Sequence, residues 1–103
     1  MKKYMTIKMP DGSTWAVPTE IVARNRAEAY ANEFRGDVEQ SLLKDTIPLF
    51  ESDQYEIQDW AENNMYWDDF GDQKVKVFDA KEIDFEEGLT NGDKKFVDEV
   101  SPC

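Results

Sequence analysis

The feature that most constrains the fold is a turn sequence near the N-terminus that separates two short segments predicted to be strands. The turn, Pro10–Ser13, is favoured because proline presets φ and the Asp-Gly pair within it tolerates a positive φ. Apolar and polar residues alternate over residues 4–9 before the turn, and residues 14–17 are predicted to return as a second strand. Alternation with a period of two residues is typical of β-strands. Residues 3–17 are therefore predicted to form a β-hairpin.

Two helices are predicted after the hairpin. The first covers about residues 18–35, with Pro18 in its first turn and apolar residues at three- and four-residue spacing along one stripe. A glycine ends it. The second starts from Asp37, which stands three residues before a glutamine in the form of an N-terminal cap. Because proline removes a helical hydrogen bond, Pro48 predicts a break or kink near residue 47.

A third helix is predicted to begin at Asp53, to be capped by Ser52 and to end near Asn63-Asn64. Its apolar residues project to one side and its acids to the other, so its outer face is acidic. Residues 74–78 then alternate, which predicts a strand at about 74–79 that joins the hairpin.

Together these elements predict an α+β fold in a single domain, residues 1–103, because a chain of this length is too short for two independent cores. A small antiparallel sheet, made of the hairpin and the strand near 74–79, is expected to pack against two or three helices. The helix over 18–35 is expected to lie across one face of that sheet. Residues 82–86 alternate more weakly, and the tail from about residue 88 is expected to be poorly ordered.

Charge is distributed unevenly along the chain, whose net charge is −11. Residues 1–36 hold six Lys/Arg against four Asp/Glu, whereas residues 37–103 hold six against nineteen. Within the second part, the 29 residues from 45 to 73 contain nine acids and no base. Such an excess of acids opposes direct binding to nucleic acid or to an anionic membrane, so neither is expected.

The sequence favours a cytoplasmic protein. No apolar run approaches the roughly 20 residues that cross a bilayer, and the N-terminus does not resemble a signal peptide. Cys103 is the only cysteine, so no intramolecular disulfide can form and a reducing compartment fits best.

The residues that most enzymes and metal sites need are absent. The chain has no histidine, which excludes Ser-His-Asp and Cys-His catalytic arrangements and the commonest transition-metal ligand. Its dispersed glycines form no phosphate-binding loop. The acids at 68–72 do not match a calcium-binding loop, and those at 82–86 are what a solvated edge strand would show. We therefore expect no enzyme activity, no metal and no cofactor.

An aromatic group lies inside the base-free stretch, with acids between its members. One interpretation is that Trp60 and another of these side chains belong to the core and that the acids keep the rim soluble. The other is an interaction surface, because Trp and Tyr dominate binding hot spots while the surrounding charges select the partner. The group comprises Trp60, Met65, Tyr66, Trp67 and Phe70, with the acids Asp59, Glu62, Asp68 and Asp69.

Four acids of the third helix, from Asp53 to Glu62, recur every three residues. Each step rises about 4.5 Å but falls about 60° short of a full turn, so the line of carboxylates curves around the helix. A solvated helix face explains this pattern, and so does a surface that competes with nucleic acid for a basic groove. The hypothesis is that residues 51–72 dock on a basic partner protein through Glu56, Asp59, Glu62, Tyr66, Trp67, Asp68, Asp69, Phe70 and Asp72.

Three segments resemble small proteins encoded by tailed bacteriophages. They are the run Asp11–Pro18, the run Ile21–Ala31 and the later Asp59–Met65, so the resemblance covers the first two thirds of the chain. It carries no catalytic motif. Phage accessory proteins of this size and acidity include inhibitors of host defence and of the transcription machinery, so the resemblance implies a protein that acts in the host cytoplasm on a basic, nucleic-acid-handling partner.

The sequence therefore favours a non-enzymatic acidic protein-binding module, a phage-encoded modulator or inhibitor of a basic host protein. Two alternatives remain open. One is a structural or assembly protein that acts through self-association of its aromatic surface, and the other is a small metal-dependent enzyme.

Overall fold

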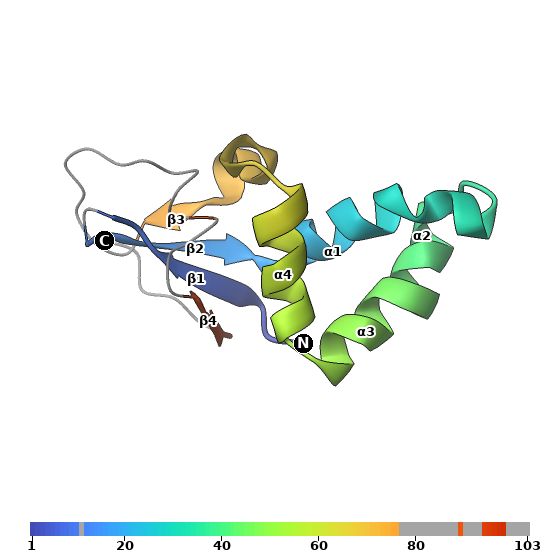
Figure 1. The fold of residues 1–103 in the computed structure, drawn as a ribbon, viewed down its shortest axis with the longest axis horizontal. Coiled ribbons are helices and arrows are strands. Elements are labelled where there is room, and N and C mark those ends of the chain that lie inside the picture. The colour runs from blue at the N-terminus through green and yellow to red at the C-terminus, as the bar shows by residue number, and fades with distance from the viewer. Residues whose placement is uncertain (11, 77–88, 90–93, 99–103) are drawn as a thin grey trace.

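The computed structural model of the chain describes residues 1–10, 12–76, 89 and 94–98. Within this part, the strands form an antiparallel sheet of order β3-β2-β1-β4, and helices pack beside it (Figure 1). This arrangement confirms the predicted α+β class, with a small antiparallel sheet and packed helices.

The hairpin forms as predicted from β1 (Tyr4–Lys8) and β2 (Thr14–Pro18), which pair antiparallel over their full length. Two backbone hydrogen bonds close the turn. The Met9 N–H donates to the Ser13 carbonyl at 2.7 Å, and the Gly12 N–H donates to the Met9 carbonyl at 3.0 Å. Gly12 adopts a φ of 90°, a value that side-chain-bearing residues rarely tolerate, which is why the turn needs its glycine.

The sheet extends on both sides of the hairpin. β3 (Val75–Lys76) pairs with β2, which confirms the strand predicted there, although residues 77–79 lie outside the described part. β4 (Lys94–Val97) pairs with β1 on the opposite edge. The sequence did not predict β4, and the expectation of a poorly ordered tail from about residue 88 is wrong for these four residues. The weakly alternating segment 82–86 lies outside the described residues.

The helix predicted over 18–35 is divided in two. α1 (Thr19–Ala29) is α-helical, and η1 (Ala31–Phe34) is a 3₁₀ turn. Pro18 does not stand in the first helical turn. It is the last residue of β2, with an extended ψ of 129°, because the next backbone N–H, that of Thr19, donates to the Lys3 carbonyl beside β1 at 2.9 Å.

The second helix begins as predicted, since the Gln40 N–H donates to Asp37 Oδ1 at 3.2 Å. It runs through α2 (Val38–Ser41), the π-helical η2 (Leu42–Thr46) and α3 (Ile47–Ser52).

A break or kink was predicted near residue 47, and the structure has a π-helical segment directly before this residue in place of a break. Ile47 keeps helical dihedrals, and its N–H donates to the Leu42 carbonyl five residues earlier. Pro48 stands in the first turn of α3. The wider π turn before it relieves the clash that a proline ring makes with the carbonyl four residues back.

The third helix is α4 (Tyr55–Asn64), and it ends where the sequence predicted. Its predicted cap is wrong. The Ser52 hydroxyl donates back to the Leu49 carbonyl within α3 at 2.7 Å, and Asp53 Oδ1 accepts from the Tyr55 N–H instead, at 2.9 Å. The 3₁₀ segment η3 (Trp67–Gln73) follows α4. None of the helices in the described part combines the length and the apolar character needed to span a bilayer.

The apolar core lies between the sheet and the helices. Figure 1 shows α4 crossing in front of the strands while α1 leads away from them, so the expectation that α1 would lie across the sheet is wrong. α1, η1, α2, η2 and α3 together form an arm, residues 19–52, that lengthens the molecule to 45 × 22 × 21 Å. Core side chains include Met5, Ile7, Val17, Val22, Ala27, Phe50, Ile57, Ala61, Met65, Trp67 and Phe70.

Candidate protein-interaction surface

Three acids of the helical arm, Glu20, Glu39 and Asp45, are paired with arginines. Arg24 donates to Glu39 Oε1 at 2.9 Å and to Glu20 Oε1 at 3.3 Å, and these hydrogen bonds raise the pKa of its guanidinium group. Arg26 donates to Asp45 Oδ2 at 2.9 Å. Asp45, the first acid of the base-free stretch, therefore acts within the arm.

Most acids later in the base-free stretch have no such partner. Glu51 lies 4.0 Å from the amine of Met1, and Glu62 lies 2.8 Å from Lys94 Nζ. The remaining acids form no ion pair with a base in the described part of the chain. We call these six residues, together with Tyr66, the acidic surface: Asp53, Glu56, Asp59, Asp68, Asp69 and Asp72.

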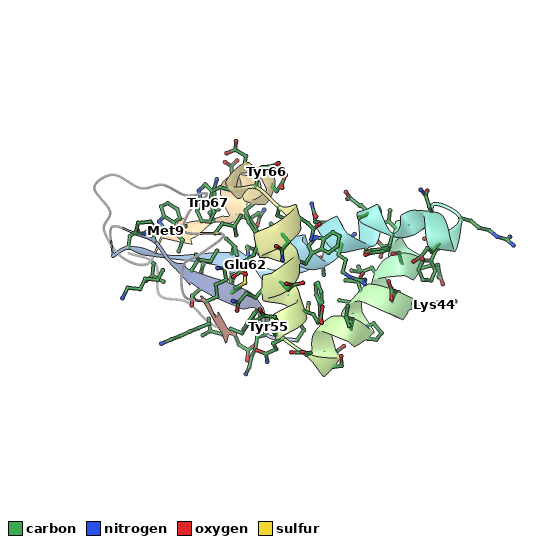
Figure 2. The ribbon with its side chains drawn as sticks, viewed as in Figure 1. Met9, Lys44, Tyr55, Glu62, Tyr66 and Trp67 are labelled. Carbon is green, nitrogen blue, oxygen red and sulfur yellow. The ribbon has the colours of Figure 1, made fainter. Side chains whose placement is uncertain are left out.

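Glu62 does not belong to this surface, although the sequence placed it there. Its Oε1 lies 2.8 Å from Lys94 Nζ and accepts a hydrogen bond from Gln58 Nε2 at 3.0 Å. The Lys94 side chain is 0% exposed, so the pair is buried against the sheet. Figure 2 shows Glu62 on the side of α4 nearest the strands. The acids of α4 follow a line that curves around the helix, as predicted. Glu62 at the end of this line therefore turns away from solvent, whereas Asp59 is exposed and Glu56 is half-buried.

Trp67 and Phe70 are core residues, which corrects the hypothesis that they contact a partner. Trp67 is 5% exposed and Phe70 1% exposed. Their rings lie 6.0 Å apart, and Trp67 meets Trp15 of β2 edge-on at 5.7 Å. Met65 is buried beside them. The interpretation that assigned part of the aromatic group to the core therefore holds for these three residues.

Trp60 also contacts other parts of the fold and is not free to bind a partner through its indole N–H. Its Nε1 donates to Asn25 Oδ1 on α1 at 2.8 Å, and its ring lies 5.8 Å from that of Tyr30. Arg26 lies over the Tyr30 ring at 4.5 Å. These contacts join α4 to the helical arm.

Tyr66 is the one member of the aromatic group that faces solvent, with 69% of its surface exposed. Its backbone is fixed, because its N–H donates to Asp69 Oδ2 at 2.7 Å while the Asp69 N–H donates to the Tyr66 carbonyl at 3.0 Å. The residues on either side, Met65 and Trp67, are buried. A rigid backbone therefore presents this ring at the η3 end of α4 (Figure 2).

Gly71 positions the last acid of the surface. It interrupts η3 with a φ of 53° and a ψ of −134°, a combination that residues with a Cβ avoid. The chain thereby changes direction between Phe70, which is buried, and Asp72, which is exposed.

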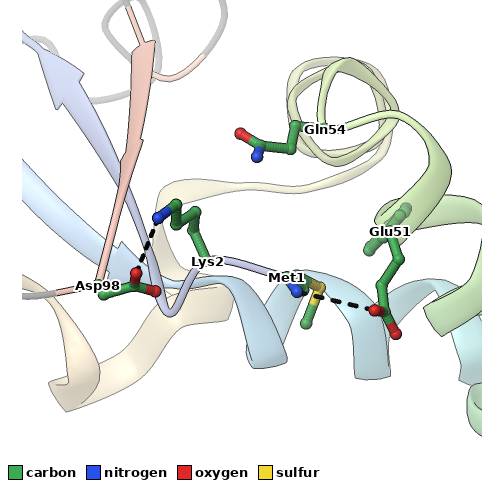
Figure 3. Close-up of a pocket in the computed structure, with 6 residues that line it drawn as sticks. Met1, Lys2, Glu51, Gln54 and Asp98 are labelled. Carbon is green, nitrogen blue, oxygen red and sulfur yellow. Dashed lines mark hydrogen bonds and ion pairs between the residues drawn. The ribbon is translucent and has the colours of Figure 1, made fainter.

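Open hollows also lie on the described surface. One of about 290 Å³ borders the acidic surface where α1 meets η3, and Asp69 is among its lining residues. A second, of about 280 Å³, lies between α3, the N-terminal residues and the end of β4 (Figure 3). Another, of about 390 Å³, is next to the start of α1. Within the described residues, no group of three acids or cysteines is arranged to hold a metal ion.

Comparisons of the chain with protein-family models, with curated proteins and with solved structures gave no match. The candidate surface is therefore argued from its own geometry. Partner binding by Tyr66 and its neighbouring acids stays a prediction, whereas Trp67 and Phe70 are buried and Glu62 is paired with Lys94.

Proposed function

We propose that the chain is a non-enzymatic protein-binding module whose acidic surface docks on a basic partner protein. The observation that carries this proposal is Tyr66, an exposed aromatic ring on a hydrogen-bonded backbone, among carboxylates that form no ion pair with a base in the part of the chain that the structure describes. Tyrosine is enriched at binding hot spots because its ring buries much area with little loss of conformational freedom.

The charges around Tyr66 indicate the chemistry of the partner. Asp68, Asp69 and Asp72 are exposed and lie within six residues of the ring in sequence. Carboxylates attract Lys and Arg side chains over distances of about 10 Å at moderate salt, and they raise the rate of encounter. The electron-rich face of a tyrosine ring also attracts these cations. A basic surface of the kind that holds nucleic acid fits both features.

The biological setting we propose is the cytoplasm of a bacterial host. The likeness of residues 11–31 to small proteins of tailed bacteriophages supports a phage-encoded modulator or inhibitor. The excess of acids over residues 37–103 supports a protein partner over nucleic acid itself.

Affinity capture from a bacterial lysate, followed by reconstitution with the purified partner, tests this proposal. Two variants probe the surface, Tyr66→Ala and the double variant Asp68→Asn with Asp72→Asn. Neither of these two aspartates forms an ion pair with a base in the described chain, so the double variant should fold normally. The matched control is Glu28→Gln with Glu33→Gln, which removes the same charge from exposed positions on the arm.

We expect both surface variants to weaken binding of the reconstituted partner by about tenfold, which corresponds to about 1.4 kcal/mol, and the control to leave it unchanged. Duplex DNA should compete with the chain for the partner. Equal binding by the wild type and both surface variants would contradict the proposal. A salt-resistant homo-oligomer that forms through Tyr66 would instead support an assembly role.

A further inference from the structure

β4 is less deeply embedded in the core than β1, the strand with which it pairs. It is an edge strand and pairs with β1 alone. β1 buries Met5 and Ile7 completely, whereas in β4 only Phe96 packs against the core, and it remains partly exposed. Strands with few buried apolar contacts open at a lower free energy than the whole domain.

Ionic contacts hold β4 at both of its ends. At the first residue, Lys94 Nζ lies 2.8 Å from Glu62 Oε1 of α4. Directly after the last residue, Asp98 accepts from Lys2 Nζ at 2.9 Å and from the Lys3 N–H at 3.3 Å (Figure 3). The hydrogen bond from Lys2 lowers the pKa of Asp98. Both contacts depend on charge, which sets β4 apart from the mainly apolar attachment of β1.

The register shows which residues of β4 face the helices. Phe96 stands opposite Met5 and Lys94 opposite Ile7, and paired residues of adjacent strands lie on the same face of a sheet. Lys94 and Phe96 therefore both project to the side where α4 lies. The β1 edge and Glu62 together therefore accommodate a strand that has a basic residue and an apolar residue two positions apart.

We propose that β4 detaches from β1 and that an extended segment of the partner, with a basic and an apolar residue in the same spacing, takes its place. Detachment exposes the backbone edge of β1 and frees the Glu62 carboxylate next to Asp59. The partner strand then pairs with β1 through main-chain hydrogen bonds and reaches Glu62 with its basic side chain. This inference rests on the proposed function, because it names a second place, the β1 edge of the sheet, at which the basic partner engages the molecule.

The sequence of β4 indicates what kind of partner strand would fit the β1 edge. The segment 94–97 reads Lys-Lys-Phe-Val, which is itself a short basic and apolar strand. Its lysine neutralises the one acid of α4 that has a base beside it in the described chain. β4 therefore occupies the edge as an internal substitute for a partner strand.

A reversible disulfide between β1 and β4 tests the proposal. Thr6 and Lys95 stand opposite each other, and neither is buried, so Thr6→Cys with Lys95→Cys places two thiols at a spacing that suits a disulfide. Cys103→Ser in the same chain removes the competing native thiol. The probe is a labelled synthetic peptide with the sequence of residues 94–98, and a peptide of scrambled order is its control.

We expect the reduced chain to bind the peptide at least tenfold more tightly than the oxidised chain, and neither form to bind the scrambled peptide. Lys94→Gln in the otherwise unaltered chain should increase peptide binding, because it removes the ion pair with Glu62 that helps to hold β4. Equal peptide binding by the oxidised and reduced chains would overturn the proposal.

Hydrogen exchange of the unaltered chain gives a second measurement that needs no substitution. Backbone amides of residues 94–97 should exchange well before those of β2 that pair with β1. Exchange of both sets only on global unfolding would also overturn the proposal.

The outcomes separate this inference from the proposed function. If the oxidised disulfide leaves peptide binding unchanged while Asp68→Asn with Asp72→Asn still weakens binding of the basic partner, strand replacement is wrong and the acidic surface stands. If the disulfide abolishes peptide binding while the aspartate variant has no effect on the partner, the edge site stands and the acidic surface fails.

Discussion

The helical arm and the α4–η3 segment are both rich in acids, but they use them differently. In the arm, Glu39 binds Arg24 and Asp45 binds Arg26, so these two carboxylates connect α2 and η2 to α1, while Glu20 binds Arg24 within α1. In α4–η3, the apolar side chains Trp67 and Phe70 hold the segment to the sheet. Apart from Glu62, which pairs with Lys94, the acids there form no ion pair with a base in the described chain. The comparison teaches that net charge alone does not identify a binding surface, because pairing decides which acids remain available.

The largest effect should come from the apolar attachment of η3. Phe70→Ala removes a ring that is 1% exposed, and we expect it to reduce the free energy of unfolding by about 3–5 kcal/mol. Tyr66→Ala, four residues away, should change the same free energy by less than about 0.5 kcal/mol because its ring faces solvent. Urea denaturation of the two variants measures both values. Similar losses would show that Tyr66 is also a structural residue.

The next largest effect should distinguish paired from unpaired charges. Arg26 is 13% exposed and donates to Asp45 and to Thr46 Oγ1, both at 2.9 Å, so Arg26→Met should cost about 2 kcal/mol of unfolding free energy. Arg35→Met is the control, since Arg35 is exposed, and it should cost a few tenths of a kcal/mol, about the size of other surface changes.

Substitution of the unpaired acids should not reduce the unfolding free energy as substitution of Arg26 does. Asp68→Asn with Asp72→Asn is expected to leave the unfolding free energy within about 0.5 kcal/mol of the wild-type value, or to raise it slightly by reducing repulsion. A loss as large as that of Arg26→Met would remove the distinction between the two regions.

A smaller effect should identify the residue that caps α4. Asp53→Ala removes the acceptor of the Tyr55 N–H and should cost about 1 kcal/mol. Ser52→Ala, which the sequence pattern would have placed at this cap, should cost less, because the Ser52 hydroxyl bonds within α3. Thermal unfolding of both variants at neutral pH measures the difference, and the reverse order would restore Ser52 as the cap.

The smallest effect concerns the ion pair after β4. Because the hydrogen bond from Lys2 lowers the pKa of Asp98 below its usual 3.8, the folded state favours the carboxylate. The resulting stability is present above pH 3.8 and is lost as the pH falls through the lowered value of the folded state. Asp98→Asn should therefore unfold at a lower temperature than the wild type at neutral pH, and the difference should shrink at about pH 3. A constant difference would show that Asp98 acts through something other than its charge.

Local signals in the sequence predicted the hairpin, the Asp37 cap and the end of α4, because a turn or a cap involves residues close together in the chain. β4 could not be predicted in this way. Its position depends on pairing with β1, whose Thr6 hydroxyl donates to the carbonyl of Lys95, 89 residues away. The four residues of β4 also lack a clear alternation that would mark them as a strand.

The errors at the candidate surface have a common physical origin. Acids next to Trp67 and Phe70 suggested that the rings were exposed, but the two aromatic residues are three positions apart in a 3₁₀ segment. Side chains at that spacing lie on the same side of a 3₁₀ helix, so both rings turn toward the core while the aspartates turn away. The three-residue spacing of Trp67 and Phe70 was the signal in the sequence that could have predicted their burial. Glu62 was misplaced because its partner, Lys94, belongs to the strand that local patterns did not reveal.

The rate of association with the basic partner, measured at low and at high salt, tests the central claim most directly. The wild type and the Glu28→Gln/Glu33→Gln control should associate rapidly at low salt and lose about tenfold in rate at high salt, whereas Asp68→Asn/Asp72→Asn should associate more slowly at low salt and show a weaker salt dependence. If all three proteins associate at the same rate and respond equally to salt, the acidic surface is not where the partner binds.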